Sequence, residues 1–386
     1  MLSAVRSVLA VPWPWAFLFR NKAKGIPLLL LVALSVLVIT TVSAITDSIM
    51  MSVYRSSVQP YEHASAIVSS GISIPLHIVR NLENSDEVEG MVPFLDSSVR
   101  VTGMMGSESR RVLAVPTAEL ENVMTRFHVR IDGGRLPIRG EPEIAIHESI
   151  ARSKGVHIGD VIGREVDSDD YLWGAFVVTG TLRGDIPMCL SSLEYFKKQW
   201  IFDAGDSSYA YIVFPAPGRL ASLNRMLGDT LGGEATAITL DSVMPAYRSE
   251  FANTRVVLWA VDLLVIVIVS IAMGLVNTVH YLTRLREFGL LASIGLTPAG
   301  LVIRTITEVL GLGLAGFGAG VALARIALWL LSVWLFEPRG IDMNYLRWRS
   351  VVFAIPVPLL VSVFSTITVW VNILRLDPVS IMEGRD

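Results

Sequence analysis

Residues that could carry out catalysis are few and scattered in this sequence. His147 and Glu148 are adjacent, but no second histidine follows at the spacing of a zinc-protease helix. Asp167, Asp169 and Asp170 offer oxygen ligands, yet their spacing is not that of an EF-hand, so we interpret them as a solvated turn. Neither a Gly-x-Ser-x-Gly elbow nor a P-loop motif occurs. The sequence therefore predicts no enzyme, and no metal or nucleotide cofactor on this chain.

Composition excludes further classes of function. Of the 386 residues, 52% are apolar and 17% are charged, which is typical of an integral membrane protein. A net charge of −3 argues against a nucleic-acid partner. Cys189 is the one cysteine, so the chain has no internal disulfide and no thiolate metal site. We interpret that thiol as a small buried filler.

The segment best suited to binding a partner is a charged turn followed by a short apolar helix, over residues 282–298. Gly295 ends this helix, and the apolar side chains lie on one of its sides. An apolar face with no partner inside so short a loop predicts docking into another protein or into lipid headgroups, and the residues alone favour neither. Its charged residues are Arg284, Arg286 and Glu287, and its apolar residues are Leu290, Leu291 and Ile294.

Apolar runs long enough to cross a membrane flank this segment, since a spanning helix takes about 20 residues. They cover residues 26–46, 256–280, 301–336 and 351–374. We therefore expect one span, a large water-facing domain over 47–255, and then three more spans. The distribution of lysine and arginine favours cytoplasmic termini and an extracytoplasmic large domain. The cations assigned to the cytoplasmic side are Arg6, Arg20, Lys22, Lys24, Arg284, Arg286, Arg375 and Arg385.

The third apolar run contains two sets of small residues spaced four apart, namely Gly311, Ala315 and Ala319, and Gly316, Gly320 and Ala324. Faces of this kind let helix backbones approach closely in lipid. We predict tight helix packing there, with a hinge as the alternative. Charged residues inside the runs are costly. We expect Asp262 near the outer interface, and Arg325 either paired or at the point where its helix leaves the hydrocarbon.

Residues 47–255 show short apolar alternations separated by Gly, Pro and Asp, which predict a mixed α+β domain. Its two ends, 47–59 and 242–255, are predicted to be stalk helices that continue the flanking spans. The predicted strands are 65–70, 99–102, 111–115, 143–146, 175–182 and 210–214, and the predicted helices are 74–82, 148–154, 190–200 and 218–227.

The loop after the second run resembles that of FtsX-like permeases of the MacB and LolC/LolE type, which are membrane subunits of ABC transporters. That family's pattern is Arg-x-x-Glu-(Phe/Ile)-Gly-(Leu/Ile)-(Leu/Met)-(Arg/Lys)-(Ala/Ser)-(Leu/Ile)-Gly-Ala, followed by a Glu in the next helix. Ala292 replaces the usual cation, and Leu296 replaces the usual Ala. The matching residues are Arg284, Glu287, Phe288, Gly289, Leu290, Leu291, Ser293, Ile294, Gly295 and Glu308.

Two further segments carry the same resemblance. Residues 374–382 resemble the family's Leu-Asp-Pro ending. Residues 133–137, 143–146, 151–160 and 176–180 follow the "Gly-Arg-x-Pro … Glu-Ile-x-Ile … Ala … Gly-x-x-Ile-Gly-Asp" series of the family's periplasmic core domain. Together with the spacing of the four apolar runs, these matches cover most of the chain.

The resemblance implies an α+β membrane protein with four transmembrane helices in a bacterial inner membrane. Residues 281–300 would be a coupling loop seated in a separate ABC ATPase subunit, which binds ATP and Mg²⁺. A second permease copy, membrane lipid and an extracytoplasmic adaptor or substrate are the other implied partners. The implied function is export or extraction of a lipid, lipoprotein, peptide or drug. The alternative is a transmembrane signalling or assembly factor without transport. The implied segments are 1–25, 26–46, 47–255, 256–280, 281–300, 301–336, 337–350, 351–374 and 375–386.

Overall fold

The computed structural model describes residues 22–103, 106–199, 208–231, 233–283, 298–341, 343, 348–352, 354–356, 358–360, 363 and 367. The chain divides into two compact units. The helical unit comprises Met1–Asp47, Thr254–Leu330 and Asn344–Asp386, and the sheet unit comprises Ser48–Asn253 and Leu331–Met343.

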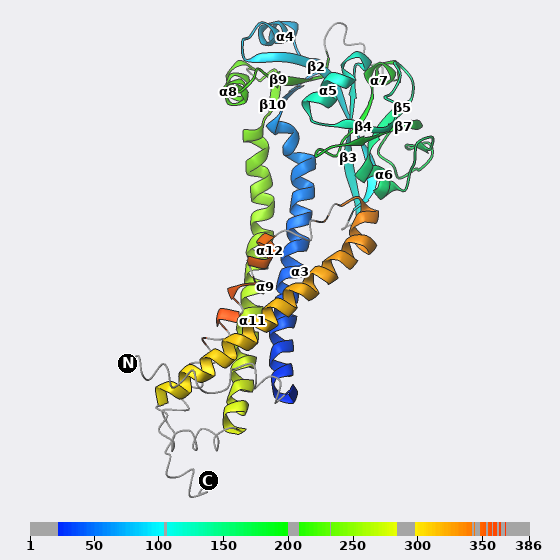
Figure 1. Cartoon of the computed structure of the whole chain (residues 1–386). Coiled ribbons are helices and arrows are strands. Elements are labelled where there is room, and N and C mark those ends of the chain that lie inside the picture. The colour runs from blue at the N-terminus through cyan, green and yellow to red at the C-terminus, as the bar shows by residue number, and fades with distance from the viewer. Residues whose placement is uncertain are drawn as a thin grey trace, which may run out of the picture. The chain divides into compact units, whose positions relative to one another are not determined.

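A mixed sheet of 10 strands forms the sheet unit, in the order β10-β1-β9-β2-β3-β8-β5-β7-β4, with β6 paired to β7 (Figure 1). The mixed α+β character predicted from the sequence is confirmed. The strands are β1 Ser65–Ser69, β2 Val88–Gly103, β3 Gly106–Val115, β4 Arg130–Gly134, β5 Glu143–His147, β6 Val161–Ile162, β7 Phe176–Arg183, β8 Cys189–Ser192, β9 Ala210–Pro215 and β10 Ala235–Ile238.

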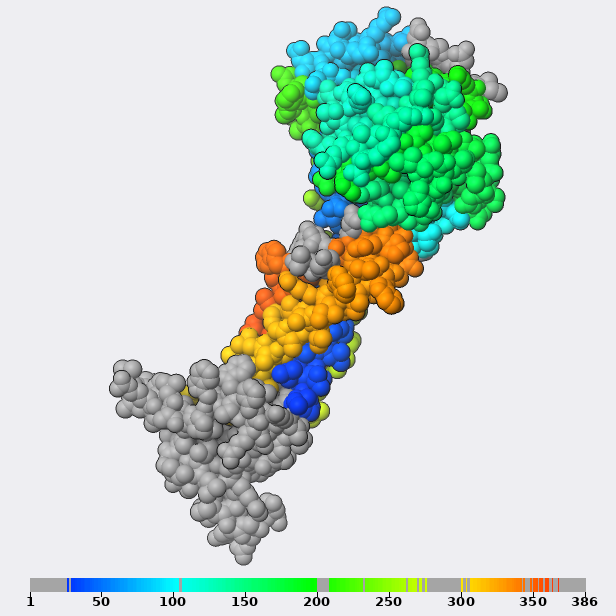
Figure 2. All heavy atoms as spheres, turned by 45° about the vertical axis from the view of Figure 1, so that its right-hand side comes forward, coloured from blue at the N-terminus to red at the C-terminus, as the bar shows by residue number. Residues whose placement is uncertain are grey.

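Strand β2 is long enough to serve two lobes. Its first part, Val88–Phe94, pairs with β9, and its second part, Leu95–Gly103, pairs with β3. Helices α4 (Leu76–Glu83) and α8 (Leu220–Thr230) cover the core of the first lobe around β1 and β9. Helices α6 (Glu148–Lys154) and α7 (Leu193–Gln199) cover that of the second lobe. Figure 2 shows the residues of both lobes, cyan to green, closely packed on the face in view.

Helix α6 illustrates how the local sequence fixes an element. The His147 side chain accepts a hydrogen bond from the Ser149 amide and caps the first turn, and Gly155 ends the helix in the left-handed region at φ +68°. The helix therefore has the bounds predicted from the sequence. In contrast, the helix predicted over 190–200 is wrong in its first residues. Cys189–Ser192 are fully buried and form β8, parallel to β3, and only Leu193–Gln199 are helical.

The prediction of a solvated turn is right for Asp167 and Asp169, whose side chains are 44% and 70% exposed, but wrong for Asp170. Asp170 is buried, and its carboxylate lies 2.7 Å from Lys154 Nζ. It also accepts a hydrogen bond from the Arg100 amide at 2.9 Å. A buried carboxylate is stable only when it is paired and hydrogen-bonded. Asp170 therefore ties β2 and α6 together within the second lobe.

The helical unit contains most of three long apolar helices: α3 (Lys22–Ser57), α9 (Leu240–Thr283) and α11 (Pro298–Leu331). A π-helical turn, η3 (Ser332–Phe336), and a 3₁₀ turn, η4 (Glu337–Arg339), follow α11. Among the described residues, three stretches are long and apolar enough to span a membrane: Leu29–Ser57, Leu240–Ile268 and Ile306–Arg339. A short helix, α12 (Trp348–Val352), precedes the fourth predicted span, which lies mostly outside the described residues and stays a prediction.

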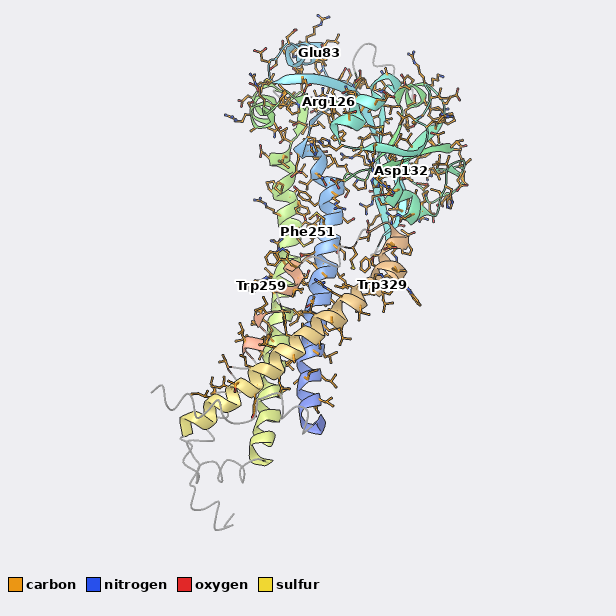
Figure 3. The ribbon with its side chains drawn as sticks, viewed as in Figure 1. Glu83, Arg126, Asp132, Phe251, Trp259 and Trp329 are labelled. Atoms are coloured by element: carbon orange, nitrogen blue, oxygen red, sulfur yellow. The ribbon has the colours of Figure 1, made fainter. Side chains whose placement is uncertain are left out.

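Helices α3 and α9 continue without a break from the helical unit into the sheet unit. Both segments predicted as stalks are therefore helical. Within the sheet unit the two helices contact each other (Figure 1). The Tyr54 and Tyr247 rings meet edge to face at 5.5 Å, and the Tyr247 hydroxyl donates to the Met50 carbonyl at 3.0 Å. Phe251, labelled on α9 in Figure 3, packs against the Tyr247 ring at 4.9 Å.

Candidate functional site

The predicted coupling residues Arg284, Arg286, Glu287, Phe288, Gly289, Leu290, Leu291, Ile294 and Gly295 lie outside the described residues. The helices that flank them are described: α9 ends at Thr283 and α11 begins at Pro298. Glu308, the acidic residue that follows the loop pattern, lies on α11 and is half-buried. The predicted coupling segment therefore follows α9 and precedes α11 in the chain.

Helix α11 contacts α3 through small residues within the helical unit. A Cβ on Gly316 would lie 2.9 Å from Val32 Cβ, and one on Gly320 would lie 2.6 Å from the Ala33 carbonyl oxygen. Ala324, the third member of this set, is fully buried. No side chain larger than hydrogen fits at either glycine without moving α3, so the two backbones are in direct contact.

The other small-residue set lies in a different environment. A Cβ on Gly311 would meet nothing within 4 Å, and Ala315 and Ala319 are half-buried. Elsewhere on α11 and α9, large side chains are exposed. Trp329 and Trp259, both labelled in Figure 3, are exposed to 51% and 65%, as is common for indoles at a membrane interface.

The motif pieces that resemble the periplasmic core domain come together in the second lobe. The Arg135 guanidinium binds the Glu143 carboxylate with both arms, at 2.5 and 2.6 Å. Glycines permit the close approach of β4 and β7. A Cβ on Gly134 would lie 2.2 Å from the Thr179 carbonyl oxygen, and one on Gly180 would lie 2.5 Å from that of Arg135. The spacing of the motif is therefore explained by packing.

The pair formed by Arg135 and Glu143 determines the charge state of the Glu143 carboxylate. Hydrogen bonds from Arg135 lower the pKa of Glu143, and the hydrogen bond from the Ile138 amide acts in the same direction. Glu143 consequently remains ionised at neutral pH and holds the turn between β4 and β5. Charge-assisted bidentate pairs of this kind are among the stronger hydrogen bonds in proteins. Their role here is structural.

The chain that follows α11 packs against α6 inside the sheet unit. Gly340 has φ +68°, and a Cβ at this position would lie 1.9 Å from the Ser149 carbonyl oxygen. Phe336, Ile341 and Met343 are buried, and the Ile341 amide donates to the Phe336 carbonyl at 3.0 Å. We call Leu331–Met343 the docking segment. It contains part of the outer loop expected between the third and fourth spans.

A cavity of about 600 Å³ lies between the two lobes of the sheet unit. Apolar side chains from both lobes form its walls, and Arg111, Asp96 and Lys197 are its charged members. Arg111 Nε lies 3.3 Å from an Asp96 oxygen, and a second guanidinium nitrogen donates to the Tyr61 hydroxyl at 3.2 Å. Burial raises the pKa of Asp96, and the charge of Arg111 opposes that shift.

Sequence reasoning missed this cavity because its residues come from segments far apart in the chain. It is lined by Tyr61, Ala66, Val68, Gly71, Ile72, Phe94, Leu95, Asp96, Ser97, Arg111, Trp173, Leu193, Phe196, Lys197, Ser208, Tyr209, Ala210 and Ile238. The one available signal was the presence of Trp173 and Tyr209 in irregular, polar stretches, where large aromatic side chains are unusual.

Comparison with known proteins identifies the C-terminal part of the chain. Residues 260–378 match the FtsX-like permease C-terminal family. The periplasmic region of MacB from Actinobacillus actinomycetemcomitans is 12% identical over 48% of this chain and 92% of its own, with a TM-score of 0.32. The extracellular domain of the ABC-type transporter YknZ from Gram-positive bacteria is 11% identical over 46% of this chain and 100% of its own, with a TM-score of 0.30.

No curated protein is significantly similar in sequence to the chain. The family match includes the loop pattern at 284–295 and Glu308 on α11. It also includes residues 374–378, which contain the Leu-Asp-Pro of the ending. These residues carried much of the resemblance in the sequence, and that resemblance is confirmed. The series over residues 133–180 lies outside the match. The C-terminal part of this chain, residues 260–378, resembles the C-terminal domain of FtsX-like permeases.

Proposed function

We propose that this chain is the permease subunit of an ABC transporter and converts ATP hydrolysis on a separate subunit into movement of its sheet unit. The observation that carries the proposal is the continuity of the long helices. Helices α3 and α9 each belong to both units, and α11 runs directly into the docking segment of the sheet unit. A helix is stiff along its axis because every turn is hydrogen-bonded. A displacement of the α9 and α11 ends therefore reaches the sheet unit.

The coupling loop is the proposed point of force entry. Leu290, Leu291 and Ile294 would fill a groove of the ATPase, while Arg284, Arg286 and Glu287 would hold the loop by charge. Glu308 would support the loop from the first turns of α11. This arrangement links two sites through one two-state element, which is what allosteric coupling requires. Substrate need not pass between the membrane helices in this mechanism.

A second permease copy is part of the proposal. Of the α9 residues within the helical unit whose exposure is described, only Ile266 is buried. The remaining apolar surface of α9 suits contact with lipid or with another copy of the chain. The proposed location is a bacterial inner membrane, with the sheet unit outside the cytoplasm and both termini inside.

Co-purification followed by an ATPase assay tests the proposal. The full-length chain, isolated from its own cells in lipid nanodiscs, should retain an ABC ATPase in stoichiometric amount. The substitution Leu291→Asp should abolish permease-stimulated ATP hydrolysis, because a carboxylate would enter the apolar groove proposed on the ATPase. The matched control is Leu76→Asp, which places the same change at an exposed position of the sheet unit and should leave hydrolysis unchanged.

Two results would contradict the proposal. One is equal ATP hydrolysis by the Leu291→Asp variant and the parent chain. The other is labelling of residues 282–298 from the outer side of intact cells by an impermeant reagent, because the proposed ATPase partner works only in the cytoplasm.

A further inference from the structure

We propose that the cavity between the two lobes is a binding site for a single-chain amphiphile with an anionic headgroup. The site lies entirely in the sheet unit, so it stands whether or not the chain is coupled to an ATPase. Its volume of about 600 Å³ is within the range of about 300–1,000 Å³ that is usual for small-ligand sites. Such sites combine mostly apolar walls with a few convergent polar groups.

The inner walls of the cavity are apolar and rigid. Phe94 on β2, Ala210 on β9 and Phe196 on α7 line it, and each is nearly fully buried. All three are held by the packed cores of the two lobes. A hydrocarbon chain fits a space of this kind because it needs no hydrogen bonds and gains from leaving water.

The outer margin of the cavity exposes large apolar side chains. Ile72 is 71% exposed, Trp173 58% and Tyr209 48%, and all three line the cavity. They come from three separate loops, yet they gather at one place. Exposed apolar groups clustered around a concave opening are typical of a ligand-binding groove. We infer that these three side chains contact the part of the ligand's hydrocarbon chain that is nearest its headgroup.

The charges that line the cavity favour an anion. Arg111 and Lys197 contribute two cations, and Asp96 contributes one carboxylate. The contacts of Arg111 with Asp96 and Tyr61 occupy two of the five N–H donors of a guanidinium. The remaining donors suit a carboxylate or phosphate oxygen. A cationic headgroup would meet net repulsion here, and a neutral one would leave these donors without a charged acceptor.

A photolabelling experiment tests the site in the intact protein. The full-length chain in nanodiscs of zwitterionic lipid is irradiated with a long-chain fatty acid that carries a diazirine, and labelled peptides are identified by mass spectrometry. We expect label on the peptides that contain Ile72, Trp173 or Tyr209, displaced by excess unlabelled fatty acid. The matching fatty alcohol, which has the same chain and a neutral head, should compete at least about tenfold more weakly, as expected for loss of one charge-assisted hydrogen bond.

Variants test the apolar margin of the cavity and its charged residues separately. Ile72→Asp places a carboxylate at the margin and should reduce labelling by the fatty acid at least about tenfold through charge repulsion. Ile138→Asp is the matched control, since Ile138 is also exposed in the sheet unit but does not line the cavity. The double variant Asp96→Asn/Arg111→Met removes the ion pair without leaving either charge alone. It should weaken the preference for the acid over the alcohol, because Lys197 is then the one cation left of the two that line the cavity.

Several results would overturn the inference. Absence of displaceable label, or label confined to peptides that do not line the cavity, would exclude an amphiphile site. Equal competition by acid and alcohol would exclude an anionic headgroup. A preference that persists undiminished in the double variant would exclude Arg111 as the group that selects the headgroup. Thermal unfolding curves show which variants are folded, and the extent of labelling is compared only among those variants.

Discussion

Replacing Gly340→Ala should detach the docking segment from α6. The new Cβ would lie 1.9 Å from the Ser149 carbonyl oxygen and 3.1 Å from Ser153 Cβ, whereas ordinary contact begins at 3.4 Å. The atom in the way is backbone inside a helix, so it cannot rotate aside as a side chain could. The docking segment must therefore withdraw, and Phe336 and Ile341 would lose part of their burial.

Gly155→Ala provides a control that is matched in backbone conformation. Gly155 has the same φ of +68° and ends α6 itself, but its Cβ would meet nothing within 4 Å. Both variants bear the cost of a left-handed alanine, roughly 1–2 kcal/mol. Only Gly340→Ala adds an overpacking term, typically about 1–3 kcal/mol. The difference between the two variants thus isolates the clash.

Amide hydrogen exchange measures that difference directly. An extra 1–3 kcal/mol corresponds to about 5- to 150-fold faster exchange of the Ile341 amide in Gly340→Ala than in Gly155→Ala. If α11 transmits movement through the docking segment, Gly340→Ala should also lower permease-stimulated ATP hydrolysis while Gly155→Ala does not. Equal exchange in the two variants would refute the packing argument. Unequal exchange with equal stimulation would refute the transmission argument.

Three further predictions follow from single residues. Gly320→Val should weaken the contact of α11 with α3 and lower the unfolding temperature in lipid nanodiscs, whereas Gly318→Val should not, because a Cβ on Gly318 meets nothing within 4 Å. Burial raises the pKa of Cys189 to about 12, so maleimide should leave the folded protein unlabelled at pH 8 and label it only after unfolding. The pKa of Glu143 is lowered from 4.5 by its hydrogen bonds with Arg135. The stability that this pair adds is present above pH 4.5 and lost as pH falls through the lowered pKa. Unfolding temperatures of the parent and Glu143→Gln should therefore converge on acidification, and a constant gap would contradict the assignment.

Elements with their own local signals could be predicted from the sequence. The α6 bounds followed from a capping residue and a terminal glycine, and the apolar runs predicted α3, α9 and α11. Strand β8 could not be predicted, because Cys189–Ser192 are a short run with two serines whose strand character depends on pairing with β3 and β5. Length alone does not separate such a run from the start of a helix.

The candidate sites also divide into those with a local sequence signal and those without one. The coupling loop was identified from a contiguous pattern, and the match over residues 260–378 includes it. The cavity was missed because Arg111, Trp173 and Tyr209 become neighbours only when both lobes are folded. The docking segment was expected to be the end of a span and an outer loop. Its membership in the sheet unit depends on a backbone contact between Gly340 and Ser149, which no local spacing encodes.

The shared strand β2 gives the sheet unit a common register. Its buried positions are Val92 and Phe94 in the first half and Val99, Val101 and Gly103 in the second, so the two halves bury opposite faces of the strand. A slip of one residue in either half would turn the inward side chains of the other half outward. Phe94 and Asp96, two positions apart on this strand, would then leave the cavity together. Both lobes must therefore form as one cooperative structure, and an insertion of a single residue near Leu95 would damage the two cores at once.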